Sequence, residues 1–294
     1  MDQSSFQPVA LADNQKYYSA WDKTPQRSID YTLANLWGWQ EYYGLEWQFE
    51  GEGFAWIRQT LPAPAQWAPI GDWGAHDWKK DLPALSGLAF TRVPEELLKI
   101  WQGLFPEQIE FEDERGQWEY LYLRKELAEL PGNRFHKKRN HYNSYVKTYG
   151  PPDYRVVTAD MIPTVLGVQD DWCQWHECED SPSLHAENTA INRVLSNWAS
   201  FRDLSAGSLF VDGKMIAFAV GEKLDAENLG VQYEKGLNGY KGVYQAMNCQ
   251  FAIHAGEGYE WINRAQDLDE EGLRQAKMTY LPASYLRKYK VRFK

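Results

Sequence analysis

Three segments of the sequence concentrate side chains that could bind or transfer a charged group. The first is the basic run LPGNRFHKKRNHYNSYVKTYG, in which no Asp or Glu occurs between positions 132 and 152. Clustered cations in a chain of net charge −10 create a local surface that attracts phosphate. We expect phosphate binding from Lys137, Lys138, Arg139 and Asn140. The alternative interpretation is a solvated helix face.

The second segment, YEWINRAQDLDEEGLRQAKMTY, places a dense polar run directly after an aromatic strand. The ends of strands are where α/β sheets commonly hold ligand groups. The alternative is an ordinary turn in which Asp267 caps a helix. The candidate site residues of this segment are Asn263, Arg264, Gln266, Asp267, Arg274 and Lys277.

The third segment, VQYEKGLNGYKGVYQAMNCQF, predicts a strand, a glycine-containing turn and a helix start. Such a connection can present backbone N–H groups to an anion. The alternative is a plain strand-to-helix connection, with the neighbouring charges at 234 and 235 forming a weak surface pair. Its candidate residues are Glu234, Lys235, Tyr244, Gln245 and Asn248.

The elements that would position these residues follow from hydrophobic periodicity and turn signals. A basic helix is expected over 135–149, stopped by Gly150-Pro151-Pro152, and further helices over 161–178 and 189–204. The segment SLFVDGKMIAFAVGEKL predicts a hairpin that turns at Asp212-Gly213. Each half thus offers helices, a hairpin and strand–helix–strand order, which indicates an α/β fold.

Cysteine usage and hydropathy favour a cytoplasmic protein. Cys173, Cys178 and Cys249 form no disulfide framework, so we expect free thiols in a reducing compartment. The spacing in WCQWHEC is not a standard zinc pattern, and no metal is expected. No run is long enough to span a membrane, and the N-terminus lacks the features of a signal peptide.

The three segments together resemble one family, the C-terminal domain of phosphatidylglycerol lysyltransferases. The resemblance covers residues 25–292. It is carried by Leu130-Pro131-Gly132 with Lys137-Lys138-Arg139-Asn140, by Glu234-Lys235 with Gly242, Tyr244, Gln245 and Asn248, and by Asn263-Arg264 with Gln266-Asp267-Leu268, Gly272-Leu273-Arg274 and Ala276-Lys277.

This resemblance implies an α/β (α+β) protein with two tandem GNAT-like acyltransferase domains, whose mixed sheets are largely antiparallel. We expect an N-terminal arm over residues 1–24, a first domain over 25–155 and a second over 156–294. Pro151-Pro152 and the loop near Ser181-Pro182 are the candidate boundary zones, and the boundary is expected near Pro152.

The implied activity is a transfer of an aminoacyl or acyl group from aminoacyl-tRNA or acyl-CoA to an amine or hydroxyl. Phosphatidylglycerol is one candidate acceptor. The partners would be a tRNA or CoA-type donor and, transiently, a membrane surface. The alternative is a non-catalytic GNAT-fold module that binds a small anionic ligand or tRNA. The polar run at 263–267 favours catalysis, whereas the imperfect phosphate loop at 239–242 favours the binding module.

The transfer that the resemblance implies needs an acceptor aligned with an activated ester and donors for the developing oxyanion. The proton of the nucleophile must also leave, and a carboxylate can take it. For this reaction Glu234 and Asp267 are the candidate bases. Asn263 could donate to the acyl oxygen, and Arg264 could neutralise a carboxylate or a phosphate.

Overall fold

The computed structural model describes residues 3–294 and divides the chain into two compact units. The first unit contains the described residues up to Glu119, together with Gln266–Glu271 and Tyr285–Lys294. The second unit contains Tyr120–Ala265 and Gly272–Ser284. The second unit is therefore inserted in the sequence of the first.

This division differs from the expected boundary at Pro151-Pro152, because the chain returns twice to the first unit after residue 265. The last strand explains the return, since it pairs within the first sheet and not the second. The expected N-terminal arm also differs from the structure. Residues 14–21 form a helix whose Tyr17 and Trp21 are buried in the first core, while residues 1 and 2 lie outside the described part.

The first sheet has the strand order β1-β2-β3-β4-β5-β14-β6. Its neighbours pair antiparallel, except that β4 and β5 run parallel. The strands are β1 (Gln7–Pro8), β2 (Glu46–Phe49), β3 (Phe54–Gln59), β4 (Ala65–Gly71), β5 (Ala89–Pro94), β6 (Ile109–Asp113) and β14 (Lys288–Phe293).

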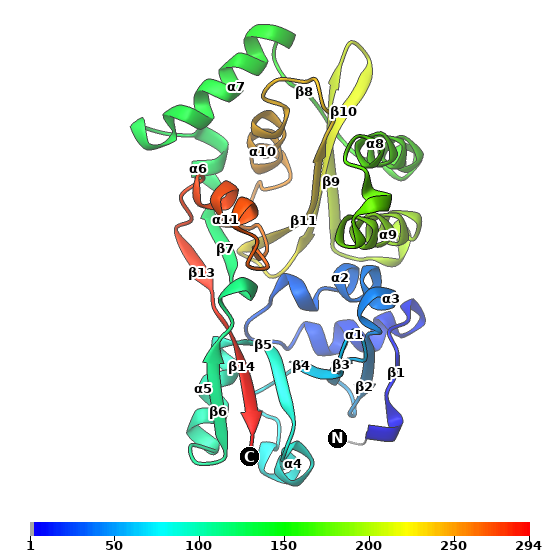
Figure 1. The fold of residues 1–294 in the computed structure, drawn as a ribbon, viewed down its shortest axis with the longest axis vertical. Helices are drawn as coiled ribbons and strands as arrows, with labels where there is room; N and C mark the ends of the chain where they lie inside the picture. The colour runs from blue at the N-terminus through cyan, green and yellow to red at the C-terminus, as the bar shows by residue number, and fades with distance from the viewer. Residues whose placement is uncertain (1–2) are drawn as a thin grey trace. The chain divides into compact units, whose positions relative to one another are not determined.

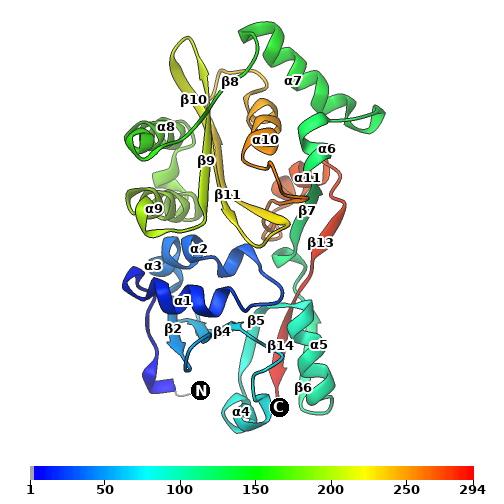
Figure 2. The ribbon, with the colours of Figure 1, turned by 180° about the vertical axis from the view of Figure 1, so that it is seen from behind.

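Aromatic side chains fill the core of the first unit. Seven tryptophans among its described residues are fully buried: Trp21, Trp47, Trp56, Trp67, Trp73, Trp78 and Trp101. The helices are α1 (Asn14–Trp21), α2 (Leu33–Gly38), α3 (Gln40–Tyr43), α4 (Trp78–Leu85) and α5 (Glu95–Leu104). Helix α1 packs on β3 and β4, and α5 packs on β5 and β14 (Figure 2).

Four of the buried charged residues in this first unit form one cluster. Asp30 accepts a hydrogen bond of 2.6 Å from Arg92 and is also bonded by the Lys288 ammonium. The same ammonium donates to Glu119 over 2.7 Å. Glu119 in turn accepts from the Ser28 hydroxyl and from a backbone N–H. The two negative and two positive groups therefore balance, which is what makes their burial tolerable.

The second sheet has the order β13-β7-β12-β11-β10-β9-β8. Strands β11 and β12 run parallel, whereas β8 to β11 form an antiparallel series. The strands are β7 (Glu119–Leu123), β8 (Asp153–Val156), β9 (Leu204–Val211), β10 (Lys214–Lys223), β11 (Asn228–Gly236), β12 (Trp261–Asn263) and β13 (Ser284–Leu286). The turn between β9 and β10 is at Asp212 and Gly213, both with positive φ, which confirms the predicted hairpin.

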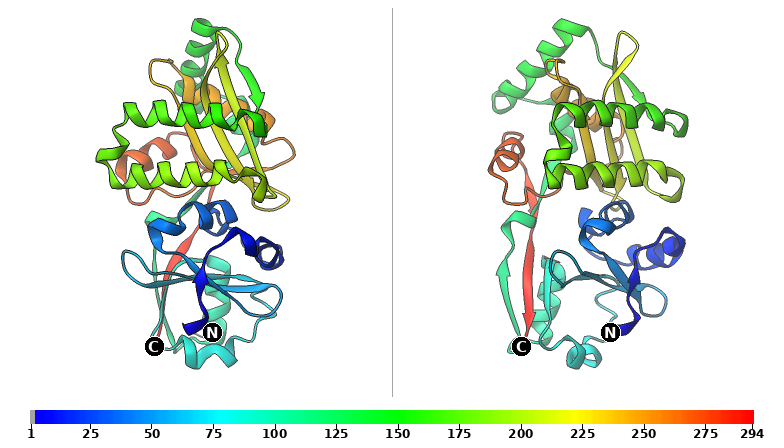
Figure 3. Two further views of the ribbon diagram at one scale, coloured as in Figure 1. Left: turned by 90° about the vertical axis from the view of Figure 1, so that its right-hand side faces the viewer. Right: turned by 45° about the vertical axis from the view of Figure 1, so that its right-hand side comes forward.

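Helices cover both faces of the second sheet. Helices α8 and α9 pack together on one face, and α10 lies on the other (Figures 1 and 3). The helices are α6 (Arg124–Glu129), α7 (His136–Tyr149), α8 (Ile162–Trp175), α9 (Pro182–Ser196), α10 (Val243–His254) and α11 (Glu271–Met278). Helix α9 begins seven residues before the predicted 189, because Ser181 caps it and Pro182 suits its first turn.

The fold-class prediction is confirmed: the protein is α/β, with two mixed and largely antiparallel sheets. In the second sheet an antiparallel hairpin leads into β11, and α10 then crosses to the parallel strand β12. Among residues 3–294, no helix is long and apolar enough to cross a membrane.

The expectation of three free thiols is wrong. Cys173 near the end of α8 and Cys178 just after it form a disulfide, with their Cα atoms 5.1 Å apart. The helix ends between them, so the chain can double back over five residues. These sulfurs are thus not available as the thiolate ligands of a zinc site, and Cys249 is the buried free thiol of the described chain.

We predict that Asp30→Asn lowers the free energy of unfolding by about 3–5 kcal/mol, because Lys288 and Arg92 lose a buried counter-charge. Burial alone would raise the pKa of Asp30, but Lys288 and Arg92 lower it below the ordinary 3.8 overall. The stability that this carboxylate contributes is therefore complete above pH 3.8 and is lost as the pH falls through the lowered value.

Urea unfolding of both proteins at pH 7, and again below pH 4, measures this effect. Asp13→Asn is the matched control, since it removes an exposed pair with Lys16 and should cost no more than about 1 kcal/mol. Equal losses in the two variants would contradict the assigned role of the buried charges.

Candidate functional site

The candidate site lies where β11 and β12 part. The two strands pair only from Asn228–Trp261 to Gly230–Asn263, after which β11 continues to Gly236 paired with β10 on its other side. We call this divergence the second-unit fork. Strand β12 ends there because Ala265 donates to the Asn263 side chain over 3.0 Å and adopts a positive φ of 56°. Asn263 is itself buried and serves this turn.

Three polar side chains meet at the second-unit fork. Glu234 on β11 accepts a hydrogen bond of 3.1 Å from the Asn248 amide on α10. Arg264, directly after β12, places one guanidinium nitrogen 3.5 Å from each oxygen of Glu234. The Glu234 and Arg264 side chains are only 11% and 17% exposed, so their charges interact through a weakly screening medium.

Asn248 leaves one buried polar atom unused. Its Nδ2 donates to Glu234, but its Oδ1 is buried and has no hydrogen-bond partner. A buried amide oxygen without a donor costs about 1–3 kcal/mol, so such atoms call for an explanation. A bound N–H or O–H group would satisfy it.

Tyr280 forms an aromatic wall beside these groups. Its ring lies 3.9 Å from the Lys138 ammonium and 5.0 Å from the Arg264 guanidinium, measured from the ring centroid. Burial raises the pKa of Tyr280 to about 12, although Arg264 and a hydrogen bond from Gln245 act in the opposite direction. Burial, and then the charge of Arg264, lower the pKa of Lys138 to about 8.

Lys235 does not share the environment of Glu234. Successive residues of a strand face opposite sides of the sheet. Lys235 therefore lies on the side of α8 and α9, 2.7 Å from Glu187 and 3.8 Å from the centre of the Trp172 ring. Tyr244, at the start of α10, accepts a 2.9 Å bond from the Trp172 indole.

The basic helix α7 contributes one side chain to the fork. Lys138 faces Tyr280, whereas Lys137 is exposed. Arg139 donates to the carbonyls of Leu130 and Gly132, at 2.6 and 2.9 Å, so its guanidinium holds the preceding loop. Asn140 is exposed and contacts His136 on the same helix at 3.2 Å.

The loop from Gly236 to Gly242 borders a cavity of about 390 Å³ that Gln245, Tyr244 and Trp175 also line. Gly242 begins α10 with a φ of 77°, and a Cβ there would collide with the carbonyl of His141 on α7.

Two N–H groups of this loop are bonded within the protein. Lys241 donates to the Tyr149 hydroxyl over 3.1 Å, and Val243 donates to the Tyr240 carbonyl over 3.2 Å. The loop thus offers an anion fewer donors than the sequence pattern suggests.

Two predicted site residues belong to the first unit. Asp267 is fully buried, accepts from Arg115 over 3.1 Å and caps the N–H of Asp269. Gln266 donates to Asp30 over 3.1 Å. In the second unit, Lys277 on α11 donates to the Arg264 carbonyl, and Arg274 lies half-buried on the same helix.

The structure thus gathers Glu234, Asn248, Arg264, Lys138 and Gln245 around one tyrosine. Sequence reasoning missed that tyrosine, Tyr280, because it lies in the unremarkable stretch KMTYLP after α11. The one signal in the sequence was that the stretch after Glu271, which contains Lys277, has no Asp or Glu.

A family model described as "Phosphatidylglycerol lysyltransferase, C-terminal" matches residues 22–292. The chain belongs to this family. The resemblance seen in the sequence is therefore confirmed, and the expected enzyme class, a transferase, is the class of the family. Family and fold support a general acyltransferase role.

Solved structures share this fold across nearly the whole chain. A conserved protein of unknown function from Bacteroides thetaiotaomicron is 30% identical, with a TM-score of 0.88, covering 98% of this chain and 99% of that one. The C-terminal domain of a putative lysylphosphatidylglycerol synthetase from Agrobacterium fabrum is 16% identical, with a TM-score of 0.66, covering 96% and 92%. L-PGS from Bacillus licheniformis is 13% identical, with a TM-score of 0.60, covering 87% and 90%.

Among curated sequences, an uncharacterized protein of Mycoplasmoides gallisepticum is 24% identical over 176 residues, which is 59% of this chain. The match spans 55% of that relative, about half of its length.

We predict that the Lys138 amine titrates with a midpoint near its lowered pKa of about 8, and that Arg264→Gln raises this midpoint. The rise follows because the variant removes a neighbouring positive charge, while the larger effect of burial remains. Competitive labelling with an amine-reactive reagent across a pH series, read by peptide mass spectrometry, measures the midpoint. A wild-type midpoint near the ordinary 10.5 would contradict the described packing against Tyr280.

Proposed function

We propose that the second unit transfers an aminoacyl group from aminoacyl-tRNA to a hydroxyl of phosphatidylglycerol. The observation that supports this most is the buried cluster at the second-unit fork, where Glu234, Arg264 and Asn248 meet and one amide oxygen lacks a donor. The family description names the same class of reaction. The alternative donor, acyl-CoA, is included in the test described below.

The charges at the fork favour an anionic substrate. Arg264 and Lys138 carry positive charge, and Glu234 balances one of them. With a pKa of about 8, Lys138 remains mainly protonated at pH 7. One positive charge therefore remains for a phosphate, such as that of the lipid headgroup or of the tRNA terminus. Lys137, exposed on the same helix, could extend this attraction toward a membrane surface.

In the proposed reaction, the acceptor hydroxyl attacks the carbonyl carbon of the aminoacyl ester and its proton passes to Glu234. The attack forms the new C–O bond and turns the carbonyl oxygen into an oxyanion. This intermediate then collapses, the bond to the tRNA ribose breaks, and the ribose oxygen takes the proton back from Glu234. Arg264 would stabilise the oxyanion formed between these steps. The Oδ1 of Asn248 would accept from the α-amino group of the donor, and so align the reactants.

The location of the donor sets the proposed compartment. Aminoacyl-tRNA is a cytoplasmic substrate, so the reaction would take place in the cytoplasm with transient contact to the lipid surface. The cavity lined by Gln245, Tyr244 and Trp175 would hold the adenosine end of the donor, because exposed rings can stack on a base. Asp267 and Gln266, in the first unit, are proposed to support their own unit and not the reaction.

The test supplies the purified chain with radiolabelled aminoacyl-tRNA or acyl-CoA donors and with phosphatidylglycerol vesicles, and measures the labelled lipid. Glu234→Gln keeps the size of the side chain and one oxygen that can accept from Asn248, but it cannot take a proton. We expect a loss in kcat of about 10²–10⁴-fold, the usual contribution of a positioned base.

Asp153→Asn is the matched control, since it neutralises an exposed carboxylate that pairs with Arg155 in the same unit. It should leave the rate unchanged. Full transfer by Glu234→Gln would contradict the assigned base. Tight binding of donors without any transferred product would favour the non-catalytic module instead.

A further inference from the structure

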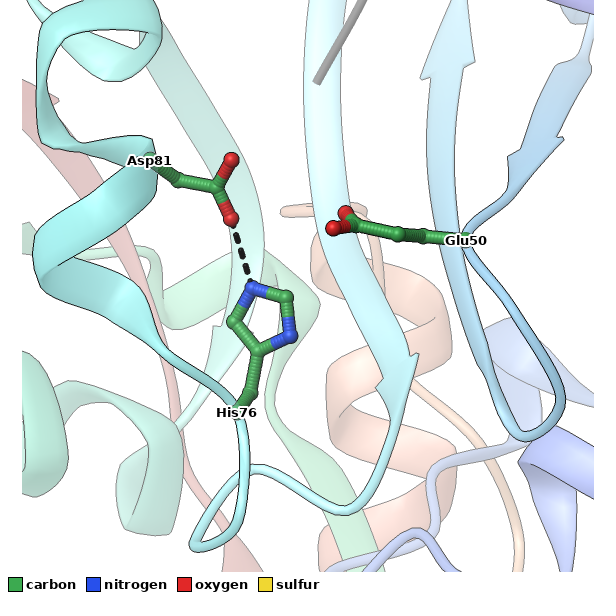
Figure 4. A group of neighbouring side chains, drawn as sticks. All are labelled: Glu50, His76 and Asp81. Atoms are coloured by element: carbon green, nitrogen blue, oxygen red, sulfur yellow. Dashed lines mark hydrogen bonds and ion pairs between the residues drawn. The ribbon is translucent and has the colours of Figure 1, made fainter.

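A histidine and two carboxylates converge in the first unit, away in sequence from the proposed transfer site. Glu50 follows β2, His76 lies in the loop before α4, and Asp81 is on α4. One nitrogen or oxygen from each lies within 4.8 Å of the others. His76 Nε2 is 2.7 Å from Asp81 Oδ2, and Glu50 points toward this pair from the opposite side (Figure 4).

Aromatic neighbours hold these side chains in place. The His76 ring stacks on Phe54 with centroids 3.9 Å apart and meets the edge of Trp78 at 4.6 Å. The indole of Trp56 donates to Glu50 over 3.1 Å. Contacts of this kind orient the ligands of metal sites, where they fix the ring plane and the carboxylate.

The charges at this position leave room for a cation. Lys80 lies 3.6 Å from Glu50, but its side chain is 72% exposed, so this ion pair is weak and readily displaced. The Asp81 and His76 side chains are only 5% and 10% exposed, so a cation between them would be shielded from solvent. Glu50, which is 36% exposed, provides the open side through which an ion could enter.

One imidazole nitrogen with two carboxylate oxygens is a donor set that suits zinc or manganese, whereas magnesium and calcium favour oxygen alone. Ligand atoms around a tetrahedral zinc ion, with bonds of about 2.1 Å, lie about 3.4 Å apart. A small rotation of Glu50 inward, with His76 and Asp81 separating slightly, would reach that spacing.

We propose that Glu50, His76 and Asp81 bind a divalent transition-metal ion, with zinc preferred, and that the ion clips the turn after β2 to the start of α4. The three ligands leave at least one coordination position for water. Nothing in the transfer reaction proposed above requires this ion.

The experiment is calorimetric titration of the full chain with zinc, manganese and magnesium after treatment with chelator, with metal content measured by mass spectrometry. We expect about one zinc ion per chain and binding at least about 100-fold weaker in Glu50→Gln and His76→Gln. Glu50→Gln retains an oxygen for the Trp56 indole and so tests the site even if His76→Gln fails to fold. His185→Gln, which removes an exposed histidine 3.5 Å from Glu179, is the matched control and should bind like the wild type.

Three results would overturn the proposal. Unchanged zinc affinity in Glu50→Gln would place the ion elsewhere, and the absence of saturable binding would leave His76 and Asp81 as a hydrogen-bonded pair only. Magnesium binding tighter than zinc would refute the transition-metal class.

Discussion

The arrangement of the first unit depends on one buried ionic interaction, in which Asp30 and Glu119 share the Lys288 ammonium and Asp30 also binds Arg92. These residues come from the beginning, the middle and the end of the chain. Because unpaired charges at such positions would be very costly, the cluster selects the one arrangement that unites them. The C-terminal strand β14 is thereby held between β5 and β6. As a result, the sequence of the second unit is inserted between segments that belong to the first unit.

The two units use the same sheet pattern differently. In the first, β4 and β5 pair at only two positions, and the Tyr31 hydroxyl fills the next one, accepting from Ala68 and donating to the Arg92 carbonyl. In the second, β11 and β12 part in a similar way, but polar side chains including Glu234 and Asn248 occupy the divergence. A divergence that a tyrosine hydroxyl bridges, as in the first unit, suits a structural role. A divergence lined by polar side chains with an unsatisfied amide oxygen, as in the second unit, suits a substrate site.

Local patterns predicted the elements of the fold well, and long-range contacts explain the rest. The hairpin at Asp212-Gly213 and the helix ended by Gly150 follow from turn and capping chemistry, which depends on near neighbours. The unit boundary was not predictable, because it depends on where the last strand pairs. Residues that are close in the sequence also lie in different environments in the structure. Lys235 faces the opposite side of the sheet from Glu234, and Asp267 belongs to the first unit although Arg264 belongs to the second.

The central claim is that substrate binds at the fork of the second unit and not at that of the first. The most direct test is the binding of a non-hydrolysable aminoacyl-adenosine amide, which mimics the end of aminoacyl-tRNA, to Asn248→Ala and Tyr31→Phe, with folding of each checked by thermal unfolding. We predict binding at least about tenfold weaker in Asn248→Ala, from the loss of one buried hydrogen bond, and unchanged binding in Tyr31→Phe. Unchanged binding in Asn248→Ala together with weakened binding in a folded Tyr31→Phe would contradict the claim.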